Sequence, residues 1–156
     1  DLVIIETVGA GQAEMRCAAI ANRIVVVEGP ARGDGIQAEK AGLLELADLI
    51  VVNKSDLDGS DKVVNDLTIS LGLTSDAPPI LKTSAVTGEG LDDLSELITR
   101  LDERTSSKRA RNRQQLLMAH ENILTANPHF EAILDRMSEE GLTLDAALRE
   151  LNERPN

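Results

Sequence analysis

Two patterns of hydrophobic and polar positions divide the chain near residue 105. Up to about residue 104, short apolar runs typical of β-strands alternate with stretches in which apolar residues recur at helical spacing. The runs predict strands at 2–5, 24–27, 49–52 and 80–81, and the helical stretches predict helices at 14–21, 37–47, 60–71 and 90–104. Strands that alternate with helices in this way indicate an α/β domain built on a parallel sheet.

Beyond about residue 106 the β runs end and only helical patterns remain. The basic stretch SSKRARNR, 106–113, fits either a linker or the start of a long helix. Further on, two apolar stripes consist of Phe130, Ile133, Leu134 and Met137, and of Leu144, Leu148 and Leu151. We expect two or three helices, with Thr143 as an N-cap, in a second domain at 105–156 after a first domain at 1–104. The stripes must be buried on the α/β core or on a partner subunit.

Local signals refine the first domain. Ser60 is a candidate N-cap and Gly72 a candidate stop for the helix at 60–71. The run 2–5 is apolar without alternation, which is the pattern of a strand covered on both faces in a parallel sheet. We expect it to be an interior strand whose neighbouring strands belong to sequence outside residues 1–156. The edge that they leave exposed would need a partner to cover it.

Composition and charge narrow the range of functions. The formal net charge of −11 disfavours nucleic acid and anionic membrane surfaces as partners, because both favour Lys and Arg. Cys17 is the single cysteine, so no internal disulfide forms, which fits a reducing cytoplasm. The sequence has neither a signal peptide nor an apolar run long enough to span a membrane. His120 and His129 have no cysteine neighbours at metal-ligand spacing, so we expect both at the surface or at its boundary with the core.

The stretch LADLIVVNKSD carries the clearest chemical signal. The predicted strand 49–52 leads directly into Asn53, Lys54, Ser55 and Asp56, the N-K-x-D pattern that reads guanine in G proteins. A carboxylate such as Asp56 can accept hydrogen bonds from N1–H and the exocyclic amine of guanine, whereas adenine would leave it unpaired at a cost. The stem of Lys54 can lie along the base, and Asn53 can tie neighbouring loops together or contact the base.

A second segment, ILKTSAVTGEG, follows the next predicted strand. It contains Ser84 and Ala85, 31 residues after Asn53. In G proteins an S-A turn at this place offers a backbone N–H to the guanine O6 atom. Ligands are expected at the carboxyl ends of parallel strands. An incidental, solvated Ser-Ala loop is the alternative, but the two segments in this order favour a guanine site.

The opening segment is compatible with metal and phosphate chemistry. Glu6-Thr7-Val8-Gly9 has the [D/E]-x-x-G form that meets the γ-phosphate in nucleotidases. An acidic residue there can hold Mg²⁺, and a glycine lets a backbone N–H approach the phosphate. Gln12 is a candidate for orienting the attacking water. Taken alone, the segment favours a tight strand-to-helix turn over a phosphate site.

The glycine-rich stretch EGPARGDGIQAEKAG predicts a loop that leads into a helix. Asp34, Gln37 and Lys40 lie around the start of that helix, and a helix N-terminus suits anions. The phosphate-cradling pattern G-x-x-x-x-G-K-[S/T] does not occur in the chain. Without it, no lysine is positioned for the β- and γ-phosphates and no hydroxyl for Mg²⁺. We therefore expect this chain alone to be inactive as a GTPase.

Three segments together resemble one family. ETVGAGQAE, GDGIQAEKAGLLELADLIVVNKSD and KTSAVTGEGLDDL closely resemble the ArgK/MeaB group of G proteins. Members of that group act as GTP-dependent chaperones of adenosylcobalamin-dependent methylmalonyl-CoA mutase and similar acyl-CoA mutases. The resemblance implies a P-loop-type G domain, here without its N-terminal phosphate-loop half, followed by a helical dimerisation arm. It is good over residues 1 to about 104 and weaker beyond.

The resemblance also implies a role for each matched residue. The base would be held by Asn53, Lys54, Asp56, Ser84, Ala85 and Val86. The residues implied for catalysis are Glu6, Gly9, Gln12 and Lys40, with Glu6 also binding Mg²⁺. Asp34 and Gln37 would lie, with Lys40, on a switch loop that signals to the mutase. GTP or GDP and Mg²⁺ are the implied cofactors, and a mutase and a second copy of the chain are the implied partners.

Two other functions are compatible with the sequence. The chain can be a non-catalytic dimerisation or interaction fragment that retains only the guanine half-site, because the phosphate loop is absent and apolar helical stripes are present. The second possible function is that of a helper GTPase in the maturation of another metallocentre, such as that of hydrogenase or urease. The lack of Cys/His clusters argues against it.

Overall fold

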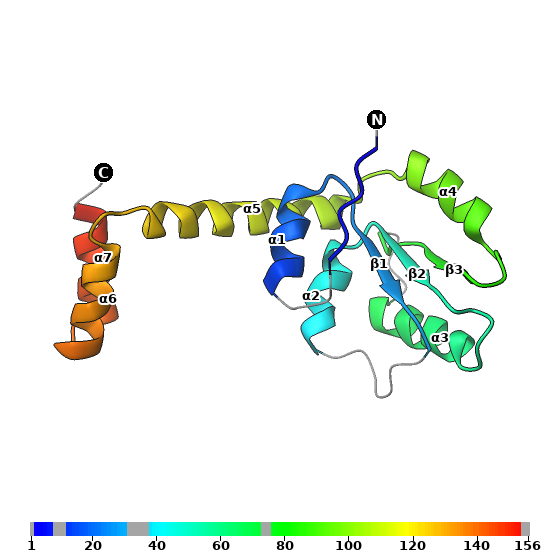
Figure 1. The fold of residues 1–156 in the computed structure, drawn as a ribbon, viewed down its shortest axis with the longest axis horizontal. Coiled ribbons are helices and arrows are strands. Elements are labelled where there is room, and N and C mark those ends of the chain that lie inside the picture. Colours follow the sequence, from blue (N-terminus) through cyan, green and yellow to red (C-terminus); the bar gives the residue numbers. More distant parts are fainter. Residues whose placement is uncertain (1, 8–11, 31–37, 73–75, 154–156) are drawn as a thin grey trace. The chain divides into compact units, whose positions relative to one another are not determined.

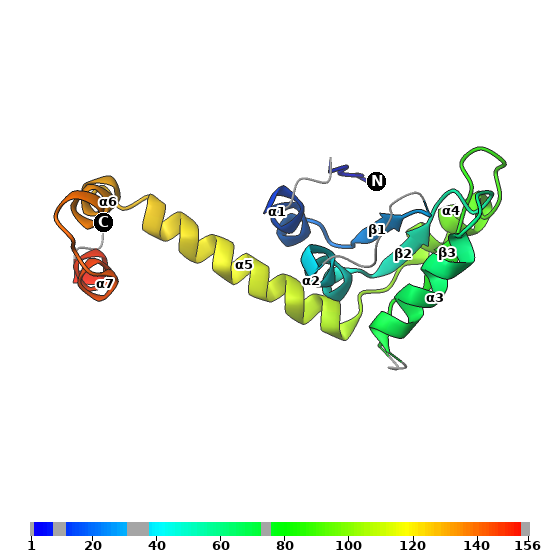
Figure 2. The same ribbon diagram turned by 90° about the horizontal axis from the view of Figure 1, so that it is seen from below.

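The chain forms two compact units, residues 1–114 and 115–156 (Figures 1 and 2). The computed structural model describes residues 2–7, 12–30, 38–72 and 76–153, with the side chains of 12–15, 38–41 and 153 excepted. The two units meet within one helix, α5, which spans Thr105–Thr125. The functional division expected between residues 104 and 105 stays a prediction.

A three-stranded parallel sheet forms the centre of the first unit. Its strands are β1, Val25–Glu28, β2, Leu49–Val52, and β3, Ile80–Lys82, in the order β1-β2-β3. Val27 is paired with Val51 across β1 and β2, and Val51 with Leu81 across β2 and β3. Because β2 lies in the middle, all four of its residues are buried. Because β2 and β3 are parallel, the loops that follow them both leave from the carboxyl end of the sheet.

Helices cover both faces of this sheet. The described part contains α1, Gln12–Ile20, α2, Ala38–Leu46, α3, Ser60–Leu71, and α4, Leu91–Arg100. Helices α3 and α4 lie on opposite sides of the strands (Figure 1). The buried cluster on the α3 side consists of Leu44, Ala47, Ile50, Val52 and Leu67. Its aliphatic character follows from a sequence with one aromatic residue in all.

Most predicted elements of this unit are present, with two corrections. The strand predicted at 2–5 is wrong, because residues 2–7 belong to no strand of the described sheet. A strand is stabilised by hydrogen bonds to a neighbouring strand, and the described sheet offers none to this segment. The four apolar side chains of residues 2–5 are exposed. Ser60 is not the N-cap of α3. Gly59 holds that position with a positive φ, and Ser60 is buried, with its hydroxyl donating to the carbonyl of Ser55.

One helix end in this unit differs from the sequence pattern, and one does not. Gly72 ends α3 as predicted, with its N–H donating to the carbonyl of Ile69. In contrast, α4 ends at Arg100, four residues earlier than predicted, and Leu101 takes an extended conformation. The basic stretch 106–113 is the beginning of α5 rather than a linker.

The beginning of α5 is anchored to the sheet by a buried carboxylate. Asp48, which immediately precedes β2, is fully buried and accepts hydrogen bonds from the N–H of Ile24 at 3.0 Å and the hydroxyl of Ser107. It also forms an ion pair with Arg111, N to O 3.0 Å, and Arg111 forms a second with Glu103 at 2.6 Å. A buried charge is tolerated only when it is paired and hydrogen-bonded, as Asp48 is.

The second unit packs two short helices against the end of α5. Helices α6, Phe130–Glu139, and α7, Leu144–Glu153, enclose a small core of Ile133, Ala147 and Leu151. Arg136 binds Glu150 through both carboxylate oxygens, at 2.6 and 3.1 Å. The hydrogen bond from this pair raises the pKa of Arg136 above its usual value. The predicted cap at Thr143 is confirmed, because its hydroxyl accepts the N–H of Ala146 at 3.3 Å.

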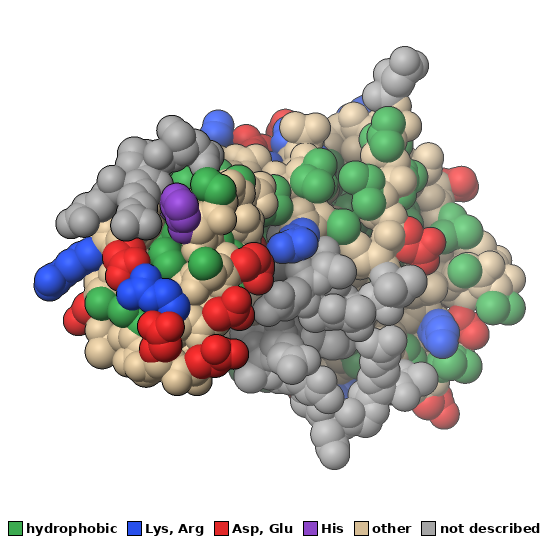
Figure 3. Space-filling model, turned by 60° about the vertical axis from the view of Figure 1, so that its left-hand side comes forward, with side chains coloured by type: hydrophobic (Ala, Val, Ile, Leu, Met, Phe, Trp, Pro, Cys, Tyr) green, Lys and Arg blue, Asp and Glu red, His purple; other side chains and the backbone are tan. Residues whose placement is uncertain are grey.

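Several large apolar side chains remain at the surface (Figure 3). On α5, Leu116 and Ile123 are 73% and 68% exposed. The predicted stripes are only partly buried, since Leu134, Leu144 and Leu148 are also exposed. Among the described residues, no helix combines the length and the apolar character that crossing a bilayer would require.

Candidate functional site

Two loops meet at the carboxyl end of the sheet. Residues 53–56 follow β2 directly, and residues 83–90 follow β3. The backbone joins them, because the N–H of Ser55 donates to the carbonyl of Thr83 at 2.9 Å. The two segments that the sequence singled out as base-reading are therefore adjacent in space.

Asn53 ties the second loop to the first. Its Oδ1 atom accepts the N–H of Ala85 at 3.2 Å and the hydroxyl of Thr83 at 3.4 Å. The predicted loop-tying role is thus compatible with the geometry. The Ala85 N–H is the donor expected for guanine O6, so a base carbonyl would share it with Asn53 or replace that acceptor.

Lys54 has an unusual backbone conformation. Its φ of 62° is in the left-handed region, and no other described non-glycine residue has a positive φ. Such conformations cost free energy and concentrate at functional sites. A Cβ atom at Gly29 would lie 3.3 Å from the Asn53 carbonyl oxygen and 4.0 Å from Cδ of Lys54. The lysine stem therefore runs past the end of β1.

Asp56 is exposed but oriented. Its Oδ1 atom accepts the hydroxyl of Ser84 at 2.5 Å, and Ser84 is fully buried. The same hydroxyl accepts the N–H of Thr87 at 3.2 Å, which fixes its direction. Within the described part of the chain, no hydrogen bond reaches Oδ2 of Asp56. The carboxylate can therefore accept two adjacent N–H groups, since each oxygen has two lone pairs.

The turn after β3 depends on Gly90. Ser84 N–H donates to the carbonyl of Glu89 and Gly88 N–H to that of Ser84, both at 2.9 Å. Gly90 has φ +70°, and a Cβ there would overlap the carbonyl oxygen of Lys82. Val86, in the second loop, has an apolar side chain that is 86% exposed.

The structure describes the remaining predicted residues only in part. Glu6 is exposed on the segment 2–7. Gln12 begins α1 and Lys40 lies in α2, but their side chains are not described. Gly9, Asp34 and Gln37 lie outside the described residues.

Sequence reasoning missed several residues that shape the site. Glu89 accepts the hydroxyl of Ser55 at 3.1 Å and so links the two loops. Gly29 provides space beside Lys54, and Thr83 supplies both a carbonyl and a hydroxyl. The position of Ser55 inside N-K-x-D could have indicated that its hydroxyl takes part in the site. The sequence spacing gave no indication that Glu89 is its partner.

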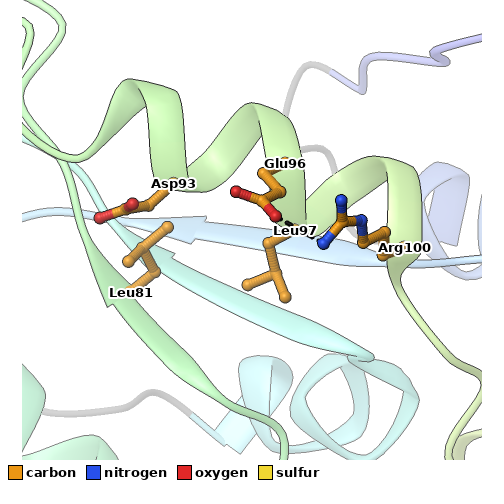
Figure 4. A pocket seen from close by; sticks show the side chains of 5 residues that line it. All are labelled: Leu81, Asp93, Glu96, Leu97 and Arg100. Atoms are coloured by element: carbon orange, nitrogen blue, oxygen red, sulfur yellow. Dashed lines mark ion pairs between the residues drawn. The ribbon is translucent and has the colours of Figure 1, made fainter.

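A pocket of about 310 Å³ lies elsewhere, between β3 and α4 (Figure 4). It is lined by Leu81, Asp93, Glu96, Leu97 and Arg100, and Glu96 pairs with Arg100 at 2.6 Å. None of the residues predicted for nucleotide binding lines it. It is therefore separate from the two loops.

Comparison with known proteins identifies the family. The family described as Methylmalonyl Co-A mutase-associated GTPase MeaB matches residues 1–140. The chain belongs to this family. The three-stranded sheet is accordingly part of an α/β P-loop-type domain, followed by the helical C-terminal part that α5, α6 and α7 form.

Individual relatives agree with this membership. A protein of Pyrococcus horikoshii whose name places it among the GTPases is 41% identical over 105 residues, 63% of this chain and 33% of the relative. The mouse methylmalonic aciduria type A homolog, mitochondrial, is 34% identical over 102 residues, 60% of this chain and 25% of the relative. GTPase ArgK of Escherichia coli is 44% identical over 63 residues, which are 40% of this chain and 19% of the relative. The chain spans about a third or less of the length of these relatives.

Proposed function

We propose that this chain carries the guanine-recognition part of a MeaB-family GTPase. The observation that supports it most is the hydrogen bond from Ser84 to Asp56, because it presents an oriented carboxylate at the carboxyl end of a parallel sheet. Asp56 would accept N1–H and the 2-amino group of guanine. Ala85 would donate its N–H to O6, and Lys54 and Val86 would lie along the base.

Exchange of the Asp56 carboxylate for a carboxamide tests this proposal. Asparagine offers one acceptor and one donor, which suits the 2-oxo group of xanthine and not the 2-amino group of guanine. Asp56→Asn should weaken binding of GDP about tenfold or more and should favour XDP. Amide chemical-shift titrations with each nucleotide measure both affinities.

Asp58→Asn is the matched control, since Asp58 is exposed two residues further on. It should leave the preference of the wild-type chain unchanged. If Asp56→Asn and Asp58→Asn both keep that preference, Asp56 does not read the base.

We further propose that the whole protein hydrolyses GTP. The family supports this activity, as do the names of the relatives. In the described part of the chain, no three His, Cys, Asp or Glu side chains gather where they could hold a metal. A Mg²⁺ site at Glu6 is therefore proposed from the family alone. The catalytic and switch residues that we propose are Glu6, Gly9, Gln12 and Lys40, and Asp34 and Gln37.

The proposed partner is an adenosylcobalamin-dependent acyl-CoA mutase, which the whole protein would chaperone in the cytoplasm. The family description names a methylmalonyl-CoA mutase association, and the mouse relative is named for methylmalonic aciduria. Co-elution of the whole protein with methylmalonyl-CoA mutase in size-exclusion chromatography, with and without GTP, tests the association. Separate elution under both conditions would contradict it.

The alternative is a non-catalytic interaction or dimerisation module. The exposed apolar side chains of α5 favour this function for the second unit. It predicts that the isolated chain associates with itself and that its binding of GDP is weak or undetectable, so micromolar binding of GDP would count against it. Titrations with GDP and ADP therefore separate the two functions.

A further inference from the structure

Glu89 is linked to the base-reading loop by a contact that the proposed recognition of guanine does not use. Its Oε2 atom accepts the hydroxyl of Ser55 at 3.1 Å. Ser55 is the neighbour of Asp56 in the N-K-x-D segment, whereas Glu89 lies 34 residues away in the turn after β3. The contact therefore adds a further link between the two loops, besides the hydrogen bond from Ser84 to Asp56 and those that Asn53 and the Ser55 N–H make.

The backbone of the turn fixes Glu89. Its carbonyl accepts the N–H of Ser84 at 2.9 Å, and its own N–H donates to the hydroxyl of Thr87 at 3.3 Å. Its carboxylate charge also contributes to raising the pKa of Lys82, after the larger effect of the hydrogen bond from Lys82 to Asp61. The backbone that carries the carboxylate is thus held within the turn after β3.

Ser55 is held as firmly on its own side. Its N–H donates to Thr83, and its carbonyl accepts the hydroxyl of Ser60, at 2.9 and 3.2 Å. Since Lys54 before it is in the left-handed conformation, the chain turns sharply there. The side chain of Ser55 consequently faces the second loop.

These contacts close a ring around Asp56. Asp56 binds Ser84, Ser84 binds Glu89 through the backbone, Glu89 binds Ser55, and Ser55 is covalently joined to Asp56. The side chain of Asp56 is exposed, so burial does not fix its position. A closed ring restrains it from two sides, and a base-reading carboxylate gains selectivity from such restraint because preorganised groups lose less entropy on binding.

We propose that Glu89, acting through the Ser55 hydroxyl, is a positioning residue that aims the Asp56 carboxylate at the exocyclic amine of guanine and so determines purine selectivity. This inference rests on the proposed guanine site. Glu89 itself does not touch the base. Its effect is on the ratio of affinities for bases with and without the amine, and less on binding as such.

The test compares GDP with IDP, which lacks the 2-amino group, by amide chemical-shift titration of the full chain. Wild type should prefer GDP. Ser55→Ala and Glu89→Ala should each lower the ratio of GDP to IDP affinity about two- to tenfold, the range that one hydrogen bond spans. The double variant should lower it no further, because both changes break the same contact. Glu89→Gln keeps an acceptor and should restore the wild-type ratio.

Asp92→Ala is the matched control, since Asp92 is an exposed carboxylate two residues past Gly90. An unchanged ratio in Ser55→Ala and Glu89→Ala, equal to that of the control, would overturn the inference while the guanine site stands. If wild type does not prefer GDP over ADP, the proposed function fails and this inference with it. If Glu89→Ala does not fold, its amide spectrum will show it. The test then depends on the other two variants: the ratio of GDP to IDP affinity should fall in Ser55→Ala and stay at the wild-type value in Glu89→Gln.

Discussion

Single atoms decide what the two loops can recognise. The Asp56 carboxylate is accessible yet directed by the buried Ser84 hydroxyl, and the Ala85 N–H is within reach of the same space. The residue types were predictable from N-K-x-D and S-A in the sequence. Their orientation was not, because it depends on Thr83, Glu89 and Gly29, which contact the motif only in three dimensions.

Replacing Gly90 should disrupt the second loop. Gly90→Ala places a Cβ against the Lys82 carbonyl at a residue with φ +70°. Gly88→Ala is the matched control, since Gly88 has φ +85° but no atom within 4 Å of a Cβ. Both should lose about 1–2 kcal/mol for the left-handed conformation, and Gly90→Ala should lose more. Urea denaturation measures this, and equal losses would show that the overlap is relieved without cost.

Acid should weaken the beginning of α5 through Asp76. Hydrogen bonds from the side chain and the N–H of Ser106 lower the pKa of Asp76 below its usual 3.8. A folded-state pKa below the unfolded one contributes stability above the unfolded pKa, which is lost as pH falls through the folded value. Wild type should therefore lose more stability below about pH 4 than Asp76→Asn. Parallel pH dependences of the unfolding free energy would contradict this.

Burial decides which elements could be predicted from the pattern. The strand at Leu49–Val52 and the helix at Ser60–Leu71 have the bounds that the sequence predicts, since their apolar positions face the core. The apolar run 2–5 predicted a strand equally well, but it has no partner in the described sheet. A hydrophobic pattern indicates what a segment can bury and not whether a neighbour is present.

The ion pair between Asp48 and Arg111 connects the start of β2 to α5, and the hydrophobic pattern of the sequence does not predict it. Arg111→Met should leave the buried Asp48 carboxylate without its cation and cost about 3–5 kcal/mol. Arg109→Met is the control, because Arg109 is exposed on the same helix, and it should cost less than about 0.5 kcal/mol. Thermal and urea unfolding measure both. Similar losses in the two variants would mean that the pair contributes little.

At the scale of the whole molecule, the exposed apolar side chains on α5 form a candidate surface for binding a second copy of the chain. Leu116 and Ile123 are seven residues apart and so share one face of the helix. If that face joins two copies, the chain should sediment as a dimer, and Leu116→Glu with Ile123→Glu should make it a monomer. The control is Ile69→Glu on α3, where Ile69 is 71% exposed. A wild-type monomer, or a dimer that survives both changes, would exclude this interface.

The central claim, that the two loops recognise guanine, is tested most directly by mapping nucleotide binding on the wild-type chain. Amide spectra are recorded with GDP and with ADP at about 1–10 mM, where interactions of only about 4 kcal/mol become visible. Recognition of guanine predicts that the amides of Asp56, Ser84 and Ala85 shift with GDP and not with ADP. Equal shifts with both nucleotides, shifts confined to the pocket beside α4, or no shifts at all would contradict it.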